Sequence, residues 1–88
     1  MPTISMFYGI IIRMYYSPGE HPPPHFHAYY AEYKAIVDIE KCEITSGNLP
    51  IKQSRLVLAW AELHKDELLA DWKLLMNGEE PFKISPIR

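Results

Sequence analysis

The chain has 88 residues, of which 48% are hydrophobic, and its formal net charge is −2. This length suits one domain, residues 1–88, with a single core. The slightly acidic balance, with no run of basic residues, makes a nucleic-acid partner unlikely, because such proteins usually carry a basic patch. The single cysteine, Cys42, cannot form an intrachain disulfide, and no apolar run is long enough for a membrane span. We therefore expect a soluble cytoplasmic protein with no membrane association.

The first half of the chain predicts a four-stranded antiparallel meander. Within residues 3–16, the run 9–16 is rich in β-branched and aromatic residues and predicts the first and longest strand. Side-chain alternation places Arg13 on the more polar face of that strand. Three further strands, joined by short turns, are predicted at residues 26–31, at residues 34–39 and around Ile44.

A segment rich in histidine and proline, His21–His27, precedes the second predicted strand. Residues 17–20 before it have the composition of a turn. Three consecutive prolines predict a stiff, extended arm that leads into the strand. His25 and His27 are two residues apart on the strand, so both side chains are expected on the same face.

After Pro50 the hydrophobic period changes from two to 3.6, which predicts a helix over residues 51–76. As one straight helix this segment would be about 39 Å long, which exceeds the sheet of so small a domain. The helix must therefore break near His64, where acidic residues suit a new helix start, or extend beyond the sheet and pack on another chain. The predicted fold is α+β, with an antiparallel four-stranded β-meander packed against one long or bent C-terminal helix.

The second alternative for the helix leads to a homodimer. An extended helix would leave apolar residues around Leu68, Trp72 and Leu75 exposed, and a two-fold dimer is the commonest way to cover such a surface. Trp60 lies three helical turns before Trp72 on the same apolar stripe and is expected in the core.

His25 and His27 permit several interpretations. As metal ligands they would need a third ligand, for which the sequence offers His21, His64 or Asp38. The chain has neither a His-Glu-x-x-His spacing nor a pair of cysteines, so we predict no metal site and no cofactor.

Acid–base catalysis is a second interpretation of the same histidines. One imidazole would transfer protons, with Tyr29 close by, while Arg13 would hold a phosphate group, as in a histidine-dependent ribonuclease that is possibly metal-assisted. In the third interpretation the imidazoles only form hydrogen bonds within the fold.

His64 lies on the apolar stripe of the predicted helix, so we expect it to be buried against the sheet. A buried imidazole needs a hydrogen-bond partner, because an unpaired one costs about 1–3 kcal/mol. The partner could be His25, His27 or Asp38, and both a core role and a site role for His64 stay open.

Three segments, Met1–Ser5, Pro23–His27 and Trp60–His64, together resemble a widespread family of small bacterial proteins known as a domain of unknown function. The resemblance covers nearly the whole chain, and the family has no established activity. Its members are often encoded beside another small protein, in a gene arrangement similar to toxin–antitoxin modules.

The resemblance thus implies a small cytoplasmic interaction protein, one component of a two-protein module, whose partner is the product of a neighbouring small gene. The residues expected to bind a ligand or this partner are Arg13, His25, His27 and His64.

Overall fold

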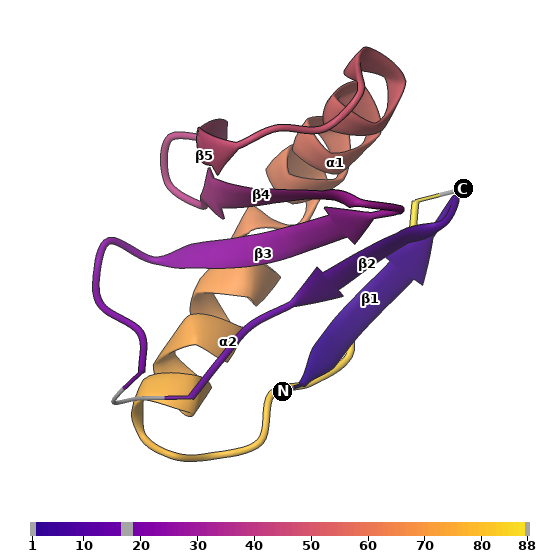
Figure 1. The fold of residues 1–88 in the computed structure, drawn as a ribbon. Helices are drawn as coiled ribbons and strands as arrows, with labels where there is room; N and C mark the ends of the chain where they lie inside the picture. The colour runs from indigo at the N-terminus through magenta and orange to yellow at the C-terminus, as the bar shows by residue number, and fades with distance from the viewer. Residues whose placement is uncertain (1, 17–18, 88) are drawn as a thin grey trace.

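A computed structural model describes residues 2–16 and 19–87. Five strands form one antiparallel sheet whose spatial order follows the chain (Figure 1). They are β1 (Thr3–Phe7), β2 (Ile10–Arg13), β3 (His25–Tyr30), β4 (Tyr33–Asp38) and β5 (Glu43–Gly47). Two helices, α1 (Ile51–Leu63) and α2 (Lys65–Met76), follow. The α+β class and the antiparallel meander are confirmed, with one strand and one helix more than the sequence predicts.

The extra strand is β1, which the sequence does not predict as a separate strand; the predicted first and longest strand, residues 9–16, is confirmed only over β2, Ile10–Arg13. A tight hairpin pairs Phe7 with Ile10, so that Tyr8 and Gly9 form the turn between β1 and β2. Both turn residues have positive φ, 50° for Tyr8 and 78° for Gly9, which matches the twist of a two-residue hairpin loop. Tyrosine rarely adopts this conformation, so the amino-acid composition of the segment does not predict a turn here. Of the turn predicted at residues 17–20, Ser17 and Pro18 lie outside the described residues.

The helical segment breaks at His64 and does not extend beyond the sheet, which confirms the first of the two predicted alternatives. The backbone there leaves helical geometry, with φ −114° and ψ 24°. Asp66 and Glu67 lie in the first turn of α2, where the helix dipole stabilises negative charge. The longest dimension of the molecule is 34 Å. Neither described helix is long and apolar enough to cross a membrane.

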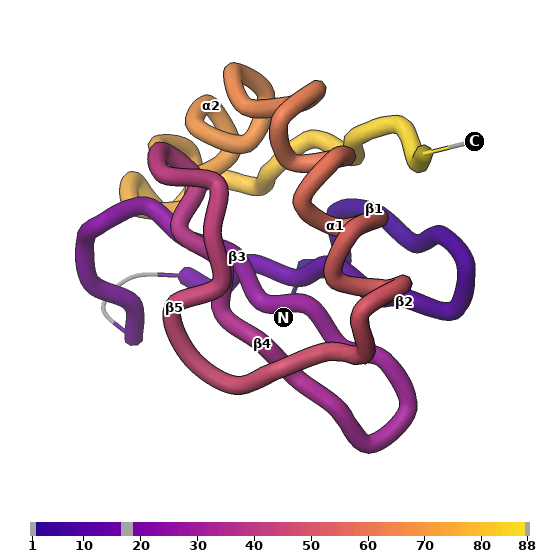
Figure 2. Tube along the Cα trace, turned by 90° about the horizontal axis from the view of Figure 1, so that it is seen from above, coloured from indigo at the N-terminus to yellow at the C-terminus, as the bar shows by residue number. Residues whose placement is uncertain are grey.

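Both helices pack on the same face of the sheet (Figure 2). Leu68 and Leu75 are completely buried there, and Trp72 retains only 7% exposure. The prediction that these residues form a homodimer contact is therefore wrong. The helix break lets α2 bury their side chains against the sheet of its own chain.

Trp60 of α1 lies at the centre of the core and has no exposed surface. Its indole packs against Phe7 of β1 and Phe26 of β3, with ring centroids 5.2 and 5.8 Å away. The indole N–H donates to the Ser85 carbonyl at 2.8 Å. Trp60 therefore connects the sheet, the first helix and the segment after α2.

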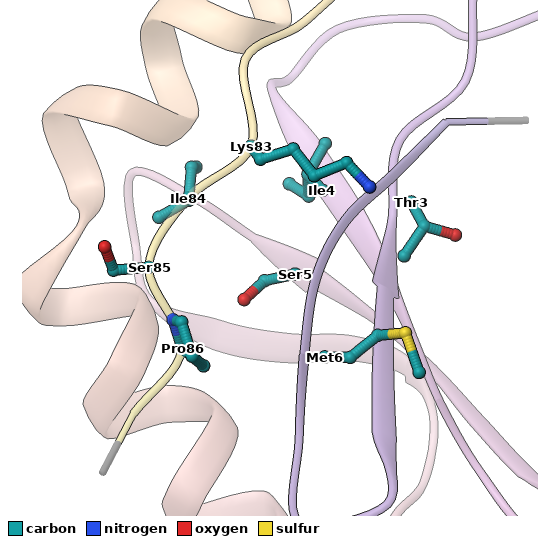
Figure 3. A pocket seen from close by; sticks show the side chains of 8 residues that line it. All are labelled: Thr3, Ile4, Ser5, Met6, Lys83, Ile84, Ser85 and Pro86. Atoms are coloured by element: carbon teal, nitrogen blue, oxygen red, sulfur yellow. The ribbon is translucent and has the colours of Figure 1, made fainter.

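The segment after α2, residues 79–87, is called the tail. It returns beside α1 to the edge strand β1 (Figure 2), where the Ile84 N–H donates to the Ile4 carbonyl at 2.8 Å. A pocket of about 420 Å³ lies between the tail and β1. Figure 3 shows that Ser5 points from β1 toward the tail, and its buried hydroxyl has no hydrogen-bond partner in the described part of the chain.

Asp71 of α2 holds the beginning of the tail. Its side chain is 2% exposed, and its Oδ1 accepts the Phe82 N–H at 2.9 Å. Burial raises the pKa of Asp71 above its ordinary value of 3.8, and the negative charge of Glu67 adds to the shift, while the Phe82 N–H opposes it. The fold therefore favours the protonated form of this carboxyl group.

The Trp60→Ala substitution should lower the free energy of unfolding by about 3–5 kcal/mol, because it leaves a large cavity and removes the bond to the tail. Chemical denaturation measures the loss. Leu63→Ala on the same helix is the control: Leu63 is 73% exposed, so its truncation should change stability by only about 0.5 kcal/mol. Equal effects of the two substitutions would contradict the central position of Trp60.

The Asp71→Asn substitution should change how stability depends on pH. A carboxyl group with a raised pKa in the folded state adds stability that is complete below its ordinary pKa of 3.8 and is lost as pH rises through the folded value. The wild type should therefore lose stability relative to Asp71→Asn across this interval. Denaturation of both proteins at a series of pH values measures the difference, and other carboxyl groups cancel in it. Parallel curves would show that the Asp71 pKa is not raised.

Candidate functional site

The face of the sheet opposite the helices has no second layer over it in the described part of the chain (Figure 2). Cross-strand pairs place Ile11 beside Tyr29, Arg13 beside His27, and His27 beside Ile36. Paired residues point to the same side of a sheet, so these five side chains share this face, called the open face. Each of them is half-buried.

A cluster of Glu20, His25 and His27, called the histidine–glutamate cluster, adjoins the open face at His27. The chain bends at Pro22 and Pro23, so the predicted extended arm is wrong. The bend brings Glu20, which precedes it, against β3: its Oε1 is 2.6 Å from His27 Nε2 and its Oε2 is 3.3 Å from His25 Nε2. The three side chains are only 14–19% exposed.

The ring of His25 has a defined orientation. Its Nδ1 lies 2.9 Å from the Pro23 carbonyl oxygen, which can only accept, so Nδ1 carries the hydrogen and donates it. In the neutral imidazole, Nε2 then carries the lone pair and faces Glu20. The other side of the ring packs on Trp72, with centroids 5.0 Å apart. Nε2 of His25 is thus available as an acceptor or a ligand.

Two tyrosines flank His27. Tyr15 meets the imidazole edge-on with centroids 4.6 Å apart, and Tyr29 lies nearly parallel to it at 6.4 Å. The two hydroxyl groups hydrogen-bond to each other. Burial, followed by this bond, raises the pKa of Tyr29 to about 12. Tyr29 therefore stays neutral at pH 7 and does not act as a base.

Arg13 lies next to the histidine–glutamate cluster. Its guanidinium carbon is 5.6 Å from the centre of the Tyr29 ring, a cation–π arrangement. Its Nε donates to the Thr3 hydroxyl at 3.2 Å. Since this bond involves Nε alone, the terminal guanidinium nitrogens remain for an anionic ligand or a partner carboxylate.

Of the predicted site residues, the structure brings together Arg13, His25 and His27 but not His64. The His64 ring contacts Trp60, with centroids 5.6 Å apart, and its Nδ1 bonds the Glu67 carboxylate of its own helical segment. The prediction of a partner on the sheet is wrong, because the helix break places the imidazole beside the first turn of α2.

The other candidates for a third metal ligand are not part of the cluster, although Asp38 pairs with His25 across β3 and β4. His21 is exposed. Asp38 is buried, and its Oδ1 accepts the Lys41 N–H in the turn after β4. The third residue of the cluster is Glu20, which sequence reasoning missed. The only feature of the sequence that could have indicated Glu20 is its position just before the proline-rich bend.

A family model described as a domain of unknown function (DUF4160) matches residues 9–73. This range includes Arg13 and the whole histidine–glutamate cluster, but neither β1 nor the tail. No significant match was found among curated proteins or among solved structures. The chain belongs to the family of this domain of unknown function.

Proposed function

We propose that the protein is a small cytoplasmic interaction protein, one component of a two-protein bacterial module that resembles a toxin–antitoxin pair. The open face is its contact surface for the product of a neighbouring small gene. The supporting observation is the set of half-buried apolar, aromatic and arginine side chains that no described segment covers. Tyrosine, other aromatic residues and arginine are enriched at protein interfaces and supply most of their binding energy.

The open face has the arrangement of an apolar centre with a charged border. Met6 of β1 is 62% exposed and pairs with Ile11, which pairs in turn with Tyr29, so an apolar row crosses three strands. Lys34, exposed and paired with Tyr29, ends the row on β4. This pattern matches a protein contact better than a nucleic-acid contact, for which the chain carries too little positive charge.

The Ile11→Glu substitution should weaken binding to the neighbouring gene product by about 2 kcal/mol or more, roughly thirtyfold, because it places a charge at the centre of the contact. Isothermal titration calorimetry with the co-expressed partner measures the change. Ile51→Glu is the matched control, since Ile51 is 72% exposed at the start of α1, on the helical side.

Equal affinity of the Ile11→Glu and Ile51→Glu proteins would contradict the open face as the contact. Sedimentation of the protein alone distinguishes the other occupant of this face, a second copy of the chain. A homodimer through the open face would dissociate on Ile11→Glu and persist on Ile51→Glu.

A histidine-dependent ribonuclease is the second candidate function. It is favoured by the 2.6 Å contact of His27 with Glu20 and by the pairing of His27 with Arg13 across the sheet. In such an enzyme, Nδ1 of His27 would accept the proton of the RNA 2′-hydroxyl. The 2′-oxygen would attack the phosphorus, and the 5′-oxygen would leave and take a proton from water. Arg13 would stabilise the charge on the phosphoryl oxygens.

Incubation of the purified protein with RNA separates the two functions. An interaction protein should leave the RNA intact, both in chelator and after addition of zinc or manganese. Cleavage that disappears in His27→Ala but persists in the His64→Ala control would instead establish the ribonuclease. A requirement for added metal would then distinguish metal-assisted from plain acid–base catalysis.

A further inference from the structure

We propose that Glu20, His25 and His27 form a binding site for one divalent transition-metal ion, with zinc as the representative member of the class. The proposal stands apart from the partner contact and from ribonuclease activity, because it concerns only the ligands that the fold brings together. It also replaces the sequence-based prediction of no metal site, which was made without Glu20 as the third ligand.

The donors and acceptors around a neutral His25 ring are not balanced. Its Nδ1 hydrogen is used by the Pro23 carbonyl, so the lone pair of a neutral ring points from Nε2 at the Glu20 carboxylate, 3.3 Å away. Two acceptors therefore face each other in a site that is 14–15% exposed. Either a proton on Nε2 or a metal ion between the two atoms satisfies both acceptors.

The three ligand atoms lie close enough together to share one metal ion. The ligand atoms of Glu20, His25 and His27 lie within 4.8 Å of one another. Zinc bonds of about 2.0–2.1 Å separate tetrahedral ligands by roughly 3.4 Å, so side-chain rotations that bring the three ligand atoms to this spacing would close the site. Zinc would replace the His27 Nε2 hydrogen that Glu20 now accepts, and this proton would leave to solvent.

The ligand types suit zinc, and a hydrogen bond orients one of the two imidazole rings. Two imidazoles and one carboxylate form the three-ligand set of many catalytic zinc sites, in which one position stays open for water or substrate. Ligating histidines normally donate their second ring hydrogen to a carbonyl or carboxylate, which fixes the ring. The Pro23 carbonyl provides this support for His25, and Trp72 packs on the same ring.

The test is a titration of the full chain, stripped of metal by chelator, with zinc against a competing indicator. One zinc ion per chain is expected. His27→Ala should weaken binding at least about tenfold. Glu20→Gln should act in the same direction while retaining the size of the side chain, so it remains informative if His27→Ala fails to fold. Cobalt in place of zinc adds an absorption spectrum that reports tetrahedral coordination.

Two controls separate this site from any surface histidine. His21→Ala removes an exposed imidazole from the same segment, and His64→Ala removes an imidazole already paired with the Glu67 carboxylate. Both variants should bind zinc as the wild type does. The site is refuted if the wild type binds no zinc, if His27→Ala and Glu20→Gln leave affinity unchanged, or if His21→Ala weakens binding equally.

Discussion

The buried indole of Trp60 joins the sheet, the first helix and the tail. It contacts rings from two different strands, and its N–H reaches the tail. A buried indole must have its donor satisfied, so the Ser85 carbonyl is fixed relative to α1. That position in turn lets Ile84 pair with Ile4 of β1. A single side chain thus sets the spacing between sheet and helices and determines where the last residues lie.

The strand β3 connects this core with the site. Phe26 and Ala28 face Trp60 and the helices and are completely buried, while His25, His27 and Tyr29 alternate with them. A shift of one residue in the pairing of β3 would move the histidines into the core, at a large energetic cost. The packing of Phe26 therefore keeps the imidazoles in register with Arg13 on one side and Ile36 on the other.

The sequence predicts those parts of the fold that depend on periodicity. Alternation identifies the strands in the middle of the chain, and the 3.6-residue period places Trp60 in the core. The first hairpin escapes prediction because Tyr8 occupies a conformation that composition assigns to glycine or asparagine. His64 is misplaced because a periodic stripe assumes a continuous helix, and the break turns its ring toward Glu67.

The candidate site is predictable only in part, for a related reason. The strand pattern places His25 and His27 on one face, but the Glu20 carboxylate reaches them through a bend in an irregular segment, which no periodicity encodes. Contacts of this kind depend on tertiary geometry.

The two edges of the sheet are protected from pairing with other chains in different ways. The edge at β5 is largely polar and ends at Gly47, where φ is +73° and a Cβ atom would come within 2.2 Å of the Lys34 carbonyl oxygen. The edge at β1 contains the buried Ile4 and Phe7 and is covered by the tail. Exposed apolar edges promote aggregation, so a chain that lost its tail would self-associate through β1 while its sheet was still folded.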